Sequence, residues 1–158
     1  MDIRFQNSPK ESASMHTNEV RENFLCESLM QENKVSLVYS HYDRVIVGGV
    51  KPVNQALSLE THEELKAAFF LERREIGIIN VGGKGTITAG TEQFTLDKLS
   101  CLYIGKGTEK VSFETTDAVD PASFFFLSVP AHATHPTRLM TKEEAAPVAL
   151  GAVATSNQ

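Results

Sequence analysis

The sequence contains only two cysteines, Cys26 and Cys101, among its 158 residues. They lack paired spacing, which argues against a zinc knuckle, and we expect two free thiols in a reducing cytoplasm, with a disulfide as the less favoured alternative. The stretch 1–14 is polar and has no apolar h-region, so we expect no signal peptide. No apolar run approaches the length that spans a bilayer. These absences together predict a cytoplasmic protein without a membrane partner.

Long basic runs are also absent. The net charge is −5, and no cluster of lysine and arginine is long enough to follow a phosphate backbone, so we expect no nucleic-acid partner. Hydrophobic residues make up 41% of the chain and charged residues 22%, which is ordinary for a soluble protein. A chain of this length can form one globular domain with a sizeable core.

The chain consists mostly of short β-rich runs separated by turn residues. Residues 1–16 show no periodicity and are expected to form a flexible N-terminal arm. Thr17 or Asn18 is predicted to cap a short helix with an apolar side formed by Val20, Phe24 and Leu25. About nine or ten strands follow, at the spacing expected of a sandwich or barrel. We predict an all-β domain over residues 17–150, with one or two very short helices.

Three local patterns refine this interpretation. Residues 61–64 and 141–144 both have the form of a capping box, and each predicts a short helical turn. The run 123–129 contains three consecutive phenylalanines and is predicted to be a strand buried on both faces.

Residues 72–90 begin with charged side chains, continue as a β-branched run and reach a glycine cluster at 82–85 before a second β-rich run. β-Branched residues favour strands, and glycine tolerates positive φ angles. We predict two strands joined by a tight glycine turn.

The charged start of this stretch holds the first candidate site. On a strand, Arg73 and Glu75 share one face, and Glu72 and Arg74 share the other. An inward-pointing arginine could hold the carboxylate of a sugar acid through two parallel hydrogen bonds. The alternative is an internal ion pair that tethers neighbouring strands, and the pattern does not decide between the two.

Two further groups contain histidine. His41 and Arg44 could lie in a pocket, although the favoured alternative is a strand edge on which Asp43 and Arg44 form an ion pair. His132 and His135 could contact a metal or a substrate. They lie between two prolines that exclude a helix, so two polar anchors in a loop are the favoured interpretation.

Two glycine-rich stretches, 82–86 and 105–108, look like fragments of a phosphate-binding loop. Neither has lysine directly followed by serine or threonine after the required glycine spacing. We therefore do not expect nucleotide binding.

The interval from Glu75 to Gly82 resembles the first motif of a cupin β-barrel. In that family, two histidines a residue apart precede the glutamate and point into the barrel. The corresponding places here fall among Ala68, Phe69, Phe70 and Leu71, none of which binds metal. Lys110 stands where the third histidine of the family would be, and an ammonium group has no free lone pair. The resemblance implies a cupin fold, a double-stranded β-helix or jelly-roll barrel, with no metal ligand in this chain.

Several longer runs resemble the N-terminal half of the 5-keto-4-deoxyuronate isomerase family and occur in the same order. They lie at 39–49, 70–75, 82–88, 103–107, 130–137 and 155–157. The resemblance covers the chain from about Phe24 to its end.

This resemblance implies a bicupin enzyme of pectin and uronate breakdown that interconverts a keto-deoxyuronate and its ketose isomer. It also implies a homohexamer with one zinc ion per subunit, held by three histidines and a glutamate in a C-terminal barrel. We expect residues 151–158 to form a linker toward such a barrel, and we expect this chain alone to be inactive. No catalytic or metal-binding residue is assigned here, and Arg73, Arg74 and His41 are the predicted contacts for a small uronate substrate.

Two alternatives remain beside this interpretation. One is a metal-free module that binds sugar acids through Arg73 or Arg74. The other is a structural barrel that mainly builds a homo-oligomer around a catalytic partner.

Overall fold

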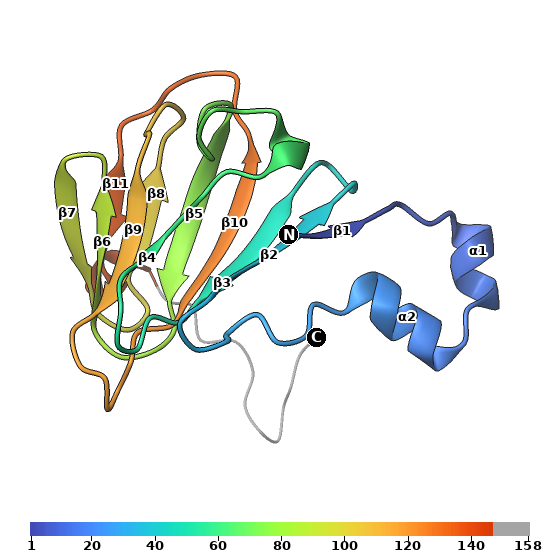
Figure 1. The fold of residues 1–158 in the computed structure, drawn as a ribbon, viewed down its shortest axis with the longest axis horizontal. Helices are drawn as coiled ribbons and strands as arrows, with labels where there is room; N and C mark the ends of the chain where they lie inside the picture. Colours follow the sequence, from blue (N-terminus) through green and yellow to red (C-terminus); the bar gives the residue numbers. More distant parts are fainter. Residues whose placement is uncertain (147–158) are drawn as a thin grey trace.

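The computed structural model describes residues 1–146, which form two stacked β-sheets (Figure 1). The larger sheet has the strand order β1-β2-β3-β10-β5-β8-β11, and the smaller has the order β4-β9-β6-β7. The larger sheet contains β1 (Asp2–Arg4), β2 (Val35–Ser40), β3 (Ile46–Val50), β10 (Phe124–Pro130), β5 (Arg74–Asn80), β8 (Cys101–Ile104) and β11 (Arg138–Met140). The smaller contains β4 (Leu57–Ser58), β9 (Val111–Thr115), β6 (Gly85–Ala89) and β7 (Glu92–Leu96). The predicted all-β class is confirmed.

The core lies between the two sheets. Strand β10 occupies the middle of the larger sheet and pairs antiparallel with β3 and β5. Its Phe124 and Phe126 are fully buried and pack with Ile78 of β5 and Phe113 of the smaller sheet in one apolar cluster. Burial of β10 on both faces was predicted and is wrong, because Leu127 on its other face is 47% exposed.

The predicted hairpin within 72–90 is also wrong, although both of its strands form. Strand β5 belongs to the larger sheet, and β6 belongs to the smaller sheet, where it pairs with β7 and β9. The connection between them therefore crosses from one sheet to the other. Its glycines do not adopt positive φ angles; a Cβ atom at Gly83 would lie 1.9 Å from the backbone oxygen of Asp120. Glycine is required here by close backbone approach.

Asn80 fixes the crossing between the sheets. It is fully buried, and its amide nitrogen donates to the carbonyl oxygens of Gly83 and Leu96 at 2.7 and 2.9 Å. Its side-chain oxygen accepts the backbone N–H groups of Gly82 and Ser123 at 3.1 and 3.3 Å. One side chain thus satisfies four backbone groups where the chain leaves the larger sheet.

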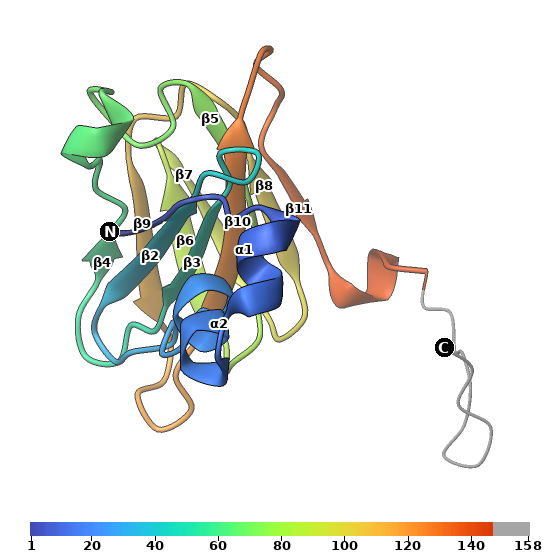
Figure 2. The same ribbon diagram turned by 90° about the vertical axis from the view of Figure 1, so that its right-hand side faces the viewer.

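The N-terminal segment has more structure than predicted. Strand β1 pairs in parallel with β2, and helix α1 (Pro9–Ser14) begins with a capping box between Ser8 and Glu11. Residues 1–16 thus contain regular structure, since backbone pairing and the cap supply local order that apolar periodicity does not reveal. Figure 1 shows α1 and α2 to one side of the two sheets. In Figure 2, turned by 90°, both helices lie in front of β3 and β10.

The predicted helix after the arm is α2 (Thr17–Phe24). His16, and not Thr17 or Asn18, occupies its N-cap position. The expected apolar side chains of this segment remain solvent-exposed, with exposed fractions between 41% and 46% for Val20, Phe24 and Leu25. In residues 1–146, α2 is the longest helix at eight residues, and no helix there is long and apolar enough to cross a membrane.

The two predicted helical turns differ in their caps. The turn η2 (Lys142–Glu144) follows a capping box in which the Thr141 N–H donates to the Glu144 carboxylate at 2.6 Å, as predicted. The turn η1 (Glu63–Leu65) forms, but the Thr61 hydroxyl instead donates to the carbonyl oxygen of Ala67 at 3.1 Å. The predicted linker at 151–158 lies outside the described residues.

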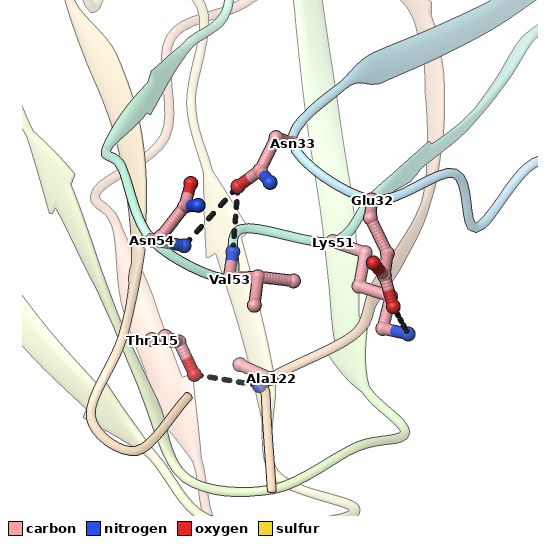
Figure 3. A network of polar contacts seen from close by, with 7 residues as sticks. All are labelled: Glu32, Asn33, Lys51, Val53, Asn54, Thr115 and Ala122. Atoms are coloured by element: carbon pink, nitrogen blue, oxygen red, sulfur yellow. Dashed lines mark hydrogen bonds and ion pairs between the residues drawn. The ribbon is translucent and has the colours of Figure 1, made fainter. Parts of the chain in front are cut away.

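A polar network joins the segment before β2 to the segment after β3 (Figure 3). The side-chain oxygen of Asn33 accepts the N–H groups of Val53 and Asn54 at 3.0 and 3.2 Å. The neighbouring Glu32 and Lys51 form an ion pair at 2.8 Å. These contacts hold two irregular segments together, and we assign them a structural role.

Candidate functional site

Arg74 is the charged residue that β5 directs into the core. Alternate residues of a strand share a face, so Arg74 points to the same side as the buried Ile76 and Ile78. Its side chain lies beside that of Tyr39, with the guanidinium carbon 6.0 Å from the ring centroid. The residue is only 7% exposed, which is rare for arginine.

Arg74 bonds to neutral acceptors. Its Nε donates to the Ser128 hydroxyl at 3.1 Å, and its Nη2 donates to the carbonyl oxygens of Ser128 and Arg44, both at 2.7 Å. In residues 1–146 no carboxylate forms an ion pair with it. The predicted internal ion pair is therefore wrong for Arg74. Strands β5 and β10 are tethered by hydrogen bonds between this guanidinium and Ser128.

The electrostatic consequence is a buried positive charge with no counter-ion among the described residues. Burial is the main cause that lowers the pKa of Arg74 to about 10; the Tyr39 hydroxyl opposes this shift, and the Arg44 guanidinium adds to it. Arg74 remains protonated at neutral pH. A buried charge without an ionic partner is costly, and an anion bound within reach of the guanidinium would lower that cost.

Arg74 lines a small pocket together with two other arginines. The pocket has a volume of about 180 Å³. Its lining residues are Tyr39, Arg44, Glu64, Leu65, Ala67, Phe70, Arg73, Arg74 and Pro130. The structure thus brings Arg73 and Arg74 to one pocket, although β-strand alternation places them on opposite faces. Arg73 lies outside β5, is exposed and donates to the carbonyl oxygen of Lys66 at 2.8 Å.

His41 does not line this pocket. It is exposed, stacks on Phe5 with ring centroids 4.6 Å apart, and meets the edge of Tyr39 at 5.2 Å. Tyr39 therefore lies between His41 and the arginines. The favoured alternative for this segment, a strand edge with an Asp43–Arg44 ion pair, is wrong: both residues adopt positive φ angles in a turn after β2, and no ion pair joins them.

Ser128 is the site residue that sequence reasoning missed. Its hydroxyl donates to the carbonyl oxygen of Glu75 at 2.7 Å while it accepts from Arg74. The available signal was that Ser128 is a lone polar residue within an apolar run, in phase with Phe124 and Phe126. A polar side chain at a core position of a strand needs a polar partner.

Glu75, the glutamate of the first cupin motif, points away from the core. It lies on the opposite face of β5 from Arg74, and its carboxylate accepts a hydrogen bond from the Tyr103 hydroxyl at 2.8 Å. Burial, together with this hydrogen bond and the charge of Glu75, raises the pKa of Tyr103 to about 12.

The residues at the expected metal positions do not form a metal site. Ala68, Phe69 and Lys110 do line one hollow of about 630 Å³, so the structure brings these positions together. Phe70 and Leu71 are buried in the apolar core. Alkyl, aromatic and ammonium groups do not fit a zinc ion. Among residues 1–146 no group of three or more histidine, cysteine, aspartate or glutamate side chains is placed to hold a metal, and His132 and His135 are exposed on a loop.

Comparison with known proteins places the chain in a family. The model of the KduI/IolB family matches residues 24–158. The chain belongs to this family. With its two facing sheets, the predicted cupin fold is confirmed.

This KduI/IolB member spans about 57% of the length of the curated relatives it matches. It is 47% identical over 157 residues to the 4-deoxy-L-threo-5-hexosulose-uronate ketol-isomerase of Shouchella clausii, and the match covers 99% of this chain and 57% of that relative. The same-named protein of Halalkalibacterium halodurans is 43% identical over 157 residues, with the same coverage. The predicted resemblance to uronate isomerases is confirmed, and the chain spans less than two thirds of these relatives.

Solved structures similar to the chain include cupin domains of low sequence identity. The cupin domain of Schizosaccharomyces pombe Cnp3 has a TM-score of 0.47 at 10% identity, covering 62% of this chain and 64% of that one. A cupin 2 domain-containing protein from Halorhodospira halophila has a TM-score of 0.42 at 14% identity, covering 70% and 72%.

Proposed function

We propose that this chain is the metal-free barrel of a ketol-isomerase that interconverts 5-dehydro-4-deoxy-D-glucuronate and 3-deoxy-D-glycero-2,5-hexodiulosonate in pectin and uronate breakdown. The support for the reaction is the name shared by relatives at 43% and 47% identity. The zinc expected for the family would be held by residues outside this chain. By itself the chain would then not turn over substrate.

The observation that carries the non-catalytic role is the set of side chains at the expected ligand positions. Ala68, Phe69 and Lys110 meet at one hollow and offer no lone pair suitable for zinc. Glu75, the glutamate of the first cupin motif, lies on the opposite face of its strand from Arg74 and accepts a hydrogen bond from the Tyr103 hydroxyl.

A chimera tests this role. We would fuse this chain to the part of the Shouchella clausii relative that it does not cover, which is the remaining 43% given the 57% coverage. We expect the chimera to isomerise keto-deoxyuronate and the 158-residue chain to give no turnover. The full-length relative controls for the assay. Turnover by the chain alone, or an inactive but folded chimera, would contradict the proposal.

A second function, binding of a sugar-acid carboxylate, is supported by the pocket at Arg74. The Nε and Nη2 atoms of Arg74 are engaged by protein oxygens, which leaves Nη1 without an acceptor among the described residues. Arg44 and Arg73 line the same pocket, so a carboxylate there would meet three positive charges and one carboxylate, that of Glu64.

Calorimetric titration tests this binding. We expect D-galacturonate to release heat on binding to the chain and D-galactose, which lacks the carboxylate, to release none. Arg74→Met should abolish the heat, whereas Lys142→Met, a change of an exposed cation outside the pocket, should leave it unchanged. Equal heats for the acid and the neutral sugar would contradict carboxylate recognition.

A further inference from the structure

The hollow that Phe69 lines at the smaller sheet, called here the Phe69 hollow, is separate from the Arg74 pocket. Its volume is about 630 Å³, and it shares no lining residue with that pocket. Sites for small organic ligands have volumes of about 300–1,000 Å³ and combine apolar surface with a few polar groups. The Phe69 hollow is therefore large enough for such a ligand, and its lining decides which ligand fits.

Three hydroxyl groups form a row along the hollow. Ser58 on β4 lies directly opposite Ser112 on β9, and Ser112 lies directly opposite Thr88 on β6. All three residues line the hollow. Residues opposite each other in antiparallel strands have Cβ atoms about 4.5–5.5 Å apart, so the three hydroxyls are evenly spaced.

These hydroxyls are available to a ligand. The serine and threonine hydroxyls that form hydrogen bonds within residues 1–146 belong to other positions. A hydroxyl both donates and accepts, so the row matches a ligand that itself carries several hydroxyl groups.

An aromatic side chain borders the same hollow. Phe69 is half-buried, and two hydrogen bonds shape the chain between β4 and this residue. The Leu59 N–H donates to the carbonyl oxygen of Val111 on β9 at 2.9 Å, which joins this connection to the sheet. The Thr61 hydroxyl donates to the Ala67 carbonyl oxygen at 3.1 Å, which closes the loop before Phe69. The hollow therefore places an apolar surface and a hydroxyl row within reach of one ligand.

The charges at the hollow disfavour an anion. Glu60, Glu109 and Lys110 line it, which gives two carboxylates and one ammonium group. None of the three forms an ion pair within residues 1–146. A ligand with a carboxylate would meet a net negative charge here, whereas three arginines and one glutamate line the Arg74 pocket. The two sites thus suit ligands of different charge.

A peptide does not fit the polar groups of this hollow. Peptides that bind a sheet pair with unoccupied backbone groups of an edge strand. The Leu59 N–H is already bonded to Val111, and the Gly90 N–H donates to the Lys110 carbonyl oxygen at 2.8 Å. The hydroxyl side chains are the groups that remain for a ligand.

We propose that the Phe69 hollow binds an uncharged oligosaccharide, with one sugar ring packed on Phe69 and sugar hydroxyls bonded to Ser58, Ser112 and Thr88. A sugar ring has C–H groups on its faces and hydroxyls around its edge, so it matches the aromatic surface and the hydroxyl row together. A single ring fills only part of the hollow, so stable binding requires linked sugars. This site does not rest on the proposed function, because it shares no residue with the Arg74 pocket.

Titrations followed by proton–nitrogen correlation NMR test the site. The probes are the uncharged tetrasaccharides cellotetraose, xylotetraose, mannotetraose and galactotetraose. We expect at least one of them to bind with a Kd of about 1 mM or lower and to shift the amide signals of Thr88, Gly90 and Ser112. Tetragalacturonate should leave these signals unchanged because of its charge, and D-galactose should do so because of its size.

A matched pair of threonine substitutions provides the control. Thr88→Val removes one hydroxyl of the row and should weaken binding by about 5-fold, the effect of one neutral hydrogen bond. Thr86→Val makes the same change on the same face of β6, at a half-buried position outside the hollow, and should leave the affinity unchanged.

Two further variants separate the parts of the proposal. Phe69→Ala should weaken binding by about 10-fold or more, because the surface that packs on the sugar ring is lost. Arg74→Met should not change the affinity for the tetrasaccharide, since Arg74 lies in the other pocket.

Three results would overturn the proposal. The first is no shift at Thr88, Gly90 and Ser112 with any of the tetrasaccharides at about 10 mM, where even millimolar binding is nearly complete. The second is an affinity that Thr88→Val and Thr86→Val reduce equally. The third is the same set of shifts with tetragalacturonate, which would show that the hollow does not select an uncharged ligand.

Discussion

Arg74 on β5 donates two hydrogen bonds to Ser128 on the neighbouring strand β10, one to the hydroxyl at 3.1 Å and one to the carbonyl oxygen at 2.7 Å. A third bond, to the carbonyl oxygen of Arg44 at 2.7 Å, joins the turn after β2 to the same guanidinium. This arginine therefore both ties three segments together and carries the charge of the candidate site.

Replacement of Arg74 by methionine should separate these two roles. Methionine keeps much of the apolar volume but leaves two backbone carbonyl groups without their donor, so we expect a loss of about 2 kcal/mol in the free energy of unfolding. Urea denaturation measures it. Arg73→Met, a change at the exposed neighbour, should alter stability by no more than about 0.5 kcal/mol. Equal effects of the two substitutions would contradict the structural role of Arg74.

Asn80 should be among the most sensitive positions of the fold. Asn80→Ala removes the partner of four backbone groups, all at the buried crossing between the sheets. We expect it to lower the free energy of unfolding by about 3 kcal/mol or more, since each buried unsatisfied group costs about 1–3 kcal/mol. Gln93→Ala, at an exposed position of β7, is the control and should change little. A loss below about 1 kcal/mol would show that water replaces the side chain.

Tyr103 should make stability depend on pH in the alkaline range. An unfolded tyrosine ionises near pH 10, and the folded pKa is about 12. Since the folded state holds the proton more tightly, the stabilisation is present below pH 10 and is lost as the pH rises toward 12. Absorbance at 295 nm should show one of the three tyrosines ionising late, and Tyr103→Phe should remove that late step. Tyr42→Phe, the control, should preserve it.

The strands could be predicted from the sequence because β-branched runs between turn residues rarely form any other secondary structure. The pairing of these strands could not be predicted. The glycines at 82–85 suit either a tight turn or a close backbone approach, and only the position of Asp120, far along the chain, selects the second. Local sequence therefore predicted β5 and β6 but not their separation into two sheets.

The candidate site was predictable in part. Arg74 is in phase with Ile76 and Ile78, which indicates an inward side chain, but Ile79 and Val81 in the opposite phase obscure that pattern. The acceptors of its guanidinium come from Ser128 and from the Arg44 carbonyl oxygen, which are 54 and 30 residues away. Contacts between segments so distant in the sequence depend on the order of the strands in the sheet. Composition and periodicity do not predict that order.

We propose above all that this chain is part of a uronate ketol-isomerase and that by itself it neither holds the zinc nor catalyses the reaction. The most direct test is to measure the zinc content and keto-deoxyuronate turnover of the purified 158-residue chain after dialysis against zinc. We predict no bound zinc in stoichiometric amount and no turnover above the protein-free blank. Stoichiometric zinc together with turnover at the rate of the full-length relative would contradict the account.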